Sequence, residues 1–83
     1  MNTDLITTKA VKIAVDKLGL EETEVRENLD NPLSGALGVD SLDFVELLME
    51  LESEFNISIP DEEADNCRTL NDFVNVVEKK INV

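Results

Sequence analysis

The chain has 83 residues, of which 42% are hydrophobic and only 4% aromatic, so it can form one small domain over residues 1–83 with an aliphatic core. It has 19 acidic residues, 7 basic residues and no histidine, and its formal net charge is −12 at pH 7. This balance excludes a nucleic-acid-binding protein and a protein that binds anionic membrane surfaces, because both need clustered Lys and Arg. It favours partner proteins with basic surfaces.

Other features of composition indicate the compartment. Cys67 is the only cysteine, so no internal disulfide can form, which suits a reducing compartment. No apolar run approaches the roughly 20 residues that span a bilayer. Residues 1–4 lack the basic region and apolar stretch of a signal peptide. We therefore expect a cytoplasmic protein, with a monomer as the simplest assembly.

The first predicted element is a helix over residues 3–18, which Gly19 ends. Its apolar residues recur at helical spacing. They are Ile6, Ala10, Ile13, Ala14 and Leu18.

Residues 20–39 are predicted to be a long connection, because Asn31-Pro32 and Ser34-Gly35 oppose regular structure. A connection of this length is unusual in a small domain. However, apolar residues recur at every fourth position and are expected to anchor it on the core, with a short helical turn near residues 24–29. These anchors are Val25, Leu29, Leu33 and Leu37.

A second helix is predicted from Asp40 to about Phe55. Asp40 suits the N-cap position and Asp43 the third position of the helix, so their side chains can form a capping box. Both carboxylates also favour the positive end of the helix dipole.

Two more helices are expected after the connector at residues 56–59. Pro60 suits the first turn of a short helix over residues 61–66. Thr69, with Asp72 three residues later, predicts the start of a last helix that continues to Ile81. Since no segment alternates with a period of two, the sequence predicts an all-α fold. We expect a small four-helix bundle, with three main helices, one short third helix and a long loop between helices 1 and 2.

The second helix carries apolar residues on two faces. At about 100° per residue, Phe44, Leu47, Leu48, Leu51 and Phe55 form one stripe that suits the core. The residues Leu42, Val45 and Met49 fall on roughly the opposite side, bordered by acids. Two interpretations remain open: the long loop covers this second stripe, or it is an exposed patch that binds partner proteins.

Ser41 is the one candidate for covalent chemistry. A chain without histidine offers no base to activate a serine, so an enzymatic role for this protein is not expected. Serine is also an ordinary residue at a helix start, and a purely structural capping role is the alternative. If Ser41 reacts, another protein must act on it.

The segment from Gly38 through Val39, Asp40 and Ser41 to Glu52 resembles the attachment-site motif of acyl carrier proteins, and the resemblance covers residues 3–81. It implies that Ser41 accepts 4'-phosphopantetheine from coenzyme A, with Asp40, Leu42 and Asp43 as the flanking motif. The thiol of this arm would carry acyl intermediates as thioesters.

The resemblance also implies partners. They are a phosphopantetheinyl transferase (holo-carrier-protein synthase) and acyl-transfer, condensing and reducing enzymes of fatty acid biosynthesis, or of related polyketide or lipid pathways. Their basic surfaces would meet the partner-facing positions of this chain. Those positions are Val45, Glu46, Met49, Glu52, Asp61, Glu62 and Asp65.

Three alternatives remain, one of them a different carrier and two from other classes of protein. Ala36 and Phe44 depart from the commonest fatty-acid-synthesis pattern, which leaves open a specialised amino-acyl, D-alanyl or peptidyl carrier. An acidic adaptor that carries no cargo is the second alternative. A calcium sensor is the third, but no segment has the alternating oxygen ligands, central glycine and final glutamate of an EF-hand loop. We expect no metal site.

Overall fold

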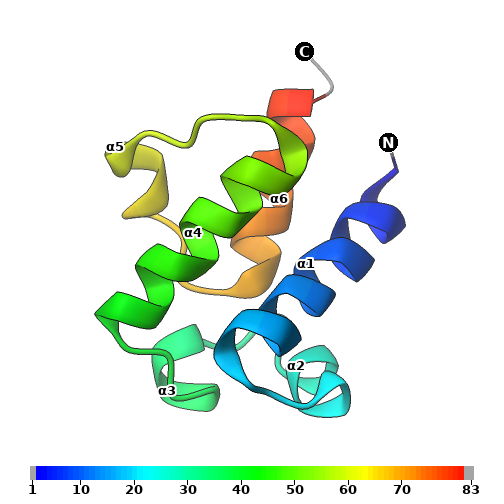
Figure 1. Cartoon of the computed structure of the whole chain (residues 1–83), viewed down its shortest axis with the longest axis vertical. Helices are drawn as coiled ribbons and strands as arrows, with labels where there is room; N and C mark the ends of the chain where they lie inside the picture. Colours follow the sequence, from blue (N-terminus) through cyan, green and yellow to red (C-terminus); the bar gives the residue numbers. More distant parts are fainter. Residues whose placement is uncertain (1, 82–83) are drawn as a thin grey trace.

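Six helices follow one another in residues 2–81, the part of the chain that the computed structural model describes. They are α1 (Thr3–Leu18), α2 (Glu22–Glu27), α3 (Leu33–Ala36), α4 (Ser41–Phe55), α5 (Asp61–Ala64) and α6 (Leu70–Ile81). Helix α1 packs against both α4 and α6, and α2 packs against α1 (Figure 1). The short helices α2 and α3 lie at the end of the molecule where α4 begins.

The all-α prediction and the three main helices are confirmed, and the bounds of α1 are those expected. Two details of the prediction were wrong. The connection over residues 20–39 contains two short helices rather than one turn. Helix α5 ends at Ala64 instead of Asn66, because the Asn66 N–H donates to the Glu63 carbonyl three residues back and tightens the chain into a turn.

The long connection is anchored on the core as predicted. Val25, Leu33 and Leu37 are buried, and the half-buried Leu29 packs against the core. Backbone hydrogen bonds reinforce this packing at the start of α6. The Leu33 N–H donates to the Arg68 carbonyl at 2.9 Å, and the Asn71 N–H donates to the Leu29 carbonyl at 3.1 Å. The connection is therefore a fixed part of the fold, and it sets where α4 begins.

The core is apolar, and no polar or charged residue of the described chain is buried in it. On α4, Leu47, Leu51 and Phe55 are buried, which confirms the predicted stripe. Phe44 is half-buried and lies against Phe73 of α6, with ring centroids 5.4 Å apart and planes tilted by 50°. Among residues 2–81, no helix is long and apolar enough to cross a membrane.

Capping fixes the start of α6. The Thr69 Oγ1 accepts from the Asp72 N–H at 3.0 Å, and the Asp72 Oδ2 accepts from the N–H groups of Arg68 and Thr69 at 2.9 and 3.1 Å. These bonds hold the pKa of Asp72 below its usual value. The bond from the Arg68 N–H is the largest cause, and the bonds from Thr69 lower the pKa further. Because α6 packs against α1, this cap helps to hold the core together.

The Asp72 cap predicts a pH-dependent loss of stability in an Asp72→Asn variant. A carboxylate with a lowered pKa in the folded state stabilises the fold above its ordinary pKa of about 3.9 and stops doing so as the pH falls through the lowered value. The variant keeps an amide oxygen as acceptor but loses the charge, so at pH 7 we expect it to lose about 1 kcal/mol of unfolding free energy, the difference between charge-assisted and neutral hydrogen bonds. Urea unfolding at several pH values should show this difference narrowing below about pH 4. A difference that stays constant down to pH 3 would contradict a charge-based cap.

Candidate functional site

Ser41 is the first residue of α4 and is exposed. The residues before it fix its place. Gly38 adopts a left-handed φ of 66°, a conformation that suits glycine, and turns the chain toward α4. The next residue, Val39, is buried, and its N–H donates to the Leu33 carbonyl at 3.1 Å. The anchored segment before α4 therefore holds Ser41 at the surface.

The side chains on either side of Ser41 form the predicted capping box. The Asp43 N–H donates to the Asp40 Oδ1 at 2.8 Å, and the Asp40 N–H donates to the Asp43 Oδ2 at 3.4 Å. Within residues 2–81, the Ser41 hydroxyl makes no hydrogen bond, since capping is performed by Asp40. The side chain of Ser41 is thus not needed to start the helix and remains available to solvent.

The second apolar stripe of α4 is not covered by the long connection. Leu42, Val45 and Met49 are 67%, 46% and 61% exposed. These three residues are referred to below as the α4 patch. The interpretation in which the loop covers the stripe is therefore wrong: the anchors of the connection are packed into the core, and backbone hydrogen bonds tie it to the start of α6. An exposed apolar patch of this kind typically marks a protein-binding surface.

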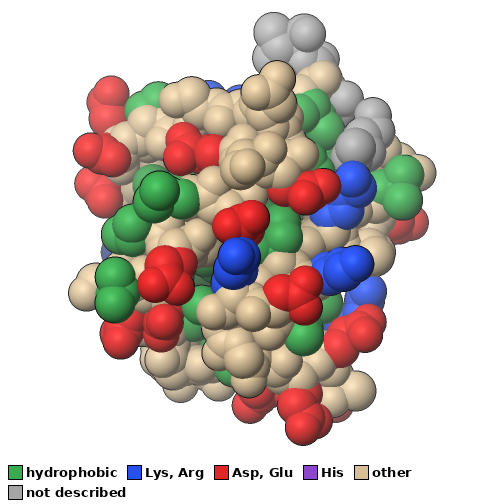
Figure 2. All heavy atoms as spheres, viewed as in Figure 1, with side chains coloured by type: hydrophobic (Ala, Val, Ile, Leu, Met, Phe, Trp, Pro, Cys, Tyr) green, Lys and Arg blue, Asp and Glu red, His purple; other side chains and the backbone are tan. Residues whose placement is uncertain are grey.

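Acidic side chains surround the α4 patch, and Figure 2 shows red acids over the face that carries α4 and α5, with blue basic side chains gathered toward α1. Glu46 is exposed beside the patch, and so are Asp61, Glu62 and Asp65 on and after α5. Glu52 is half-buried, and its Oε2 accepts from the Ile59 N–H at 2.7 Å, which holds the connector between α4 and α5. Sequence reasoning gave no sign of this structural bond.

A cavity of about 310 Å³ lies beside the first turn of α4. Phe44 lines it on one side, and residues of α3 and of the α5 region line it on the other, with Asp65 and Arg68 as its charged members. Its apolar lining residues include Leu33, Val39, Phe44, Ala64 and Cys67. Ser34 also lines it, so the cavity is bordered by both apolar and polar side chains.

Cys67 lines this cavity but is poorly suited to covalent chemistry. The thiol is buried, and its Sγ lies 3.5 Å from the Glu63 carbonyl oxygen, to which it donates. Burial, followed by the negative charges of Asp72 and Glu63, raises its pKa to about 11. Because the thiolate is the reactive form, Cys67 acts as a small buried apolar side chain. Residues 2–81 contain no cluster of three or more side chains suited to hold a metal ion.

The raised pKa of Cys67 predicts that its thiol is protected in the folded apo protein. A thiol-specific disulfide reagent at pH 8 should modify the native protein at least about tenfold more slowly than the protein in concentrated urea, where the thiol is exposed and its pKa is ordinary. Absorbance of the released reagent measures both rates. Equal rates would show that the cavity opens freely and that Cys67 is accessible.

Comparison with known proteins identifies the family of the chain. The family model described as "Phosphopantetheine attachment site" matches residues 9–77, which include all of α4. Two curated proteins named "Acyl carrier protein", from Porphyromonas gingivalis strains ATCC 33277 and W83, are each 42% identical to this chain over 76 residues. The alignments cover 92% of this chain and 95% of each relative. The chain therefore belongs to the acyl carrier protein family, whose members are non-enzymatic carriers with a phosphopantetheine attachment site.

Proposed function

We propose that Ser41 is the residue that accepts 4'-phosphopantetheine, and that residues 1–83 work as a single carrier domain. The observation that carries this proposal is the exposed, unbonded hydroxyl of Ser41 at the start of α4, where Asp40 already caps the helix. An exposed hydroxyl next to a fixed backbone fits a group that must be attached by another protein. When attached, the arm supplies a terminal thiol that carries acyl groups as thioesters.

In the proposed attachment reaction, the transferase supplies the base and the Mg²⁺. The Ser41 oxygen attacks the phosphorus of coenzyme A that bears the pantetheine arm, the bond to the bridging oxygen breaks, and adenosine 3',5'-bisphosphate leaves. The hydroxyl proton passes to a base of the transferase, whose Mg²⁺ stabilises the developing charge. Asp40 and Asp43 remain bonded to each other's N–H groups, so their role is to hold the first turn of α4 in place.

Partner enzymes are proposed to dock on the α4 patch through its apolar side chains and the surrounding acids. Charge complementarity supports this, because a chain with a net charge of −12 steers basic surfaces toward it. The proposed docking residues include Leu42, Val45, Glu46, Met49, Asp61, Glu62 and Asp65. Glu52 lies at the edge of this surface and adds charge while its Oε2 holds the connector.

The proposed partners are a phosphopantetheinyl transferase and the acyl-transfer, condensing and reducing enzymes of fatty acid biosynthesis or of a related lipid or polyketide pathway. We place the protein in the cytoplasm as a monomer. The cavity beside Phe44 is proposed as the place where a short acyl group can withdraw from water, since apolar side chains form most of its lining.

The test of Ser41 is the intact mass of the full-length apo protein after incubation with coenzyme A, Mg²⁺ and a broad-specificity phosphopantetheinyl transferase. We expect a gain of about 340 Da, the mass of one phosphopantetheine. A Ser41→Ala variant should gain nothing, and Ser34→Ala, which removes another exposed serine, should gain the full mass. Unmodified wild-type protein that is folded by circular dichroism would favour the acidic adaptor instead.

A further inference from the structure

The acidic side chains of α4 differ in how they are bonded within the protein. Asp43 accepts from the Asp40 N–H and Glu52 from the Ile59 N–H. Glu50 and Glu54 form ion pairs with lysines of α1. Glu46 is the acid of α4 without a hydrogen bond or ion pair to any residue in 2–81. The acids of the helix are therefore not equally available to a partner.

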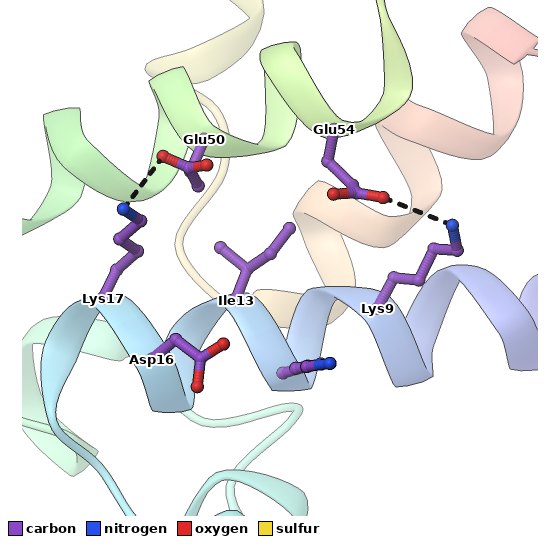
Figure 3. Close-up of a pocket in the computed structure, with 7 residues that line it drawn as sticks. Lys9, Ile13, Asp16, Lys17, Glu50 and Glu54 are labelled. Carbon is purple, nitrogen blue, oxygen red and sulfur yellow. Dashed lines mark hydrogen bonds and ion pairs between the residues drawn. The ribbon is translucent and has the colours of Figure 1, made fainter.

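Two ion pairs join α1 to one flank of α4. Lys17 Nζ lies 3.4 Å from Glu50 Oε2, and Lys9 Nζ lies 3.3 Å from Glu54 Oε2. Figure 3 shows Ile13 pointing from α1 toward α4 between the two pairs. The three α1 residues are each four positions apart and the two glutamates are also four apart, so each set lies in one row along its helix. The α1 side of α4 is thus a row of paired charges.

Lys17 also borders the docking surface. Together with Glu46, Met49 and Glu50, it lines a shallow hollow of about 200 Å³ at the edge of the α4 patch. A basic side chain of a partner that approaches Glu50 from this side meets the ammonium group of Lys17, and the two charges repel. An internal lysine therefore takes the place that a partner's cation would otherwise occupy.

The opposite flank has the reverse character. On α5, Glu63 is paired with Lys80 of α6 at 2.9 Å. The side chains of Asp61, Glu62 and Asp65 are exposed and make no hydrogen bond or ion pair within the described chain. Negative charge without an ion pair is found at Glu46, Asp61, Glu62 and Asp65, whereas Glu50 and Glu54, which face α1, are paired with lysines.

We propose that Lys17 and Lys9 mask Glu50 and Glu54, so that a basic partner docks over the α4 patch, Glu46 and α5 and is kept away from the α1 side. Lys17 is then a specificity-determining residue, because it repels partners whose cations reach toward α1 and tolerates those whose cations reach toward α5. This inference rests on the proposed docking role of α4. The masking pairs are about half exposed, so each is weak and the expected effects are several-fold rather than orders of magnitude.

The test uses the full-length apo protein and measures kcat/KM for its modification by a phosphopantetheinyl transferase with a basic docking surface. Glu46→Gln should lower kcat/KM about threefold or more, mainly through KM, because it removes an available rim charge. Glu50→Gln and Glu54→Gln should leave kcat/KM within about 1.5-fold of the wild type, because their charges are already paired. Lys17→Gln should raise kcat/KM about twofold by releasing Glu50, and this gain should vanish in the Lys17→Gln/Glu50→Gln double variant.

Two matched controls separate local from overall charge. Lys12→Gln removes a cation that lines the same α1–α4 groove without an ion pair, and Glu24→Gln removes an exposed acid on α2. Both should leave kcat/KM unchanged, and thermal melting checks that every variant is folded.

The outcomes distinguish this inference from the proposed function. If Ser41→Ala still gains mass, the attachment site is elsewhere and the proposed function is wrong. If Glu46→Gln has no effect on kcat/KM, the proposed docking on α4 is wrong, and so is the proposed masking by lysines. If Glu46→Gln weakens modification and Glu50→Gln weakens it equally, the docking surface stands and the masking is overturned. A Lys17→Gln gain that persists without Glu50 would also overturn it, since the gain would then come from overall charge.

Discussion

The capping box between Asp40 and Asp43 is the constraint on which the functional surface depends. It satisfies N–H groups at the start of α4 without using the side chain of Ser41. Because the acid before Ser41 performs the capping, Ser41 can have helical backbone geometry and still present an unbonded hydroxyl. Burial of Leu47, Leu51 and Phe55 fixes the rotation of α4, and this rotation turns Leu42, Val45 and Met49 away from the core.

Charge has two separate uses in this protein. Lysines of α1 and α6 pair with acids of α4 and α5, and these pairs join helices that are distant in the sequence. Among the acids without a lysine or arginine partner, Glu46 lies beside the exposed apolar residues of α4, and Asp61, Glu62 and Asp65 lie on or just after α5. With a net charge of −12, repulsion among the acids opposes the compact state. The ion pairs between α1 and α4 reduce this repulsion on one side of α4, while the acids of the docking surface add to it on the other side.

Some elements could be predicted from local sequence because local interactions determine them. Apolar spacing and Gly19 define α1, and the two caps at Asp40 and Thr69 define where α4 and α6 begin. The expected turn near residues 24–29 overlaps α2, but its bounds and the whole of α3 were not predicted. Helices of four to six residues are too short to be stable alone and depend on tertiary contacts such as the Leu33–Arg68 bond. The hydrogen bond from the Ile59 N–H to the Glu52 Oε2 and the lysine ion pairs were missed for the same reason, since they depend on how the chain folds in space.

Whether the α4 patch is covered could not be decided by helical periodicity, since periodicity shows that two apolar faces exist but not what lies against each. The answer comes from the anchors of the long connection, which hold it to the start of α6 and away from Leu42, Val45 and Met49. Burial of the anchor residues of the connection therefore affects the functional surface as well as the stability of the fold. The contacts that stabilise the connection are also the ones that leave the α4 patch open, and a change that loosened Leu33 or Leu37 would affect both the position of Ser41 and the surface beside it.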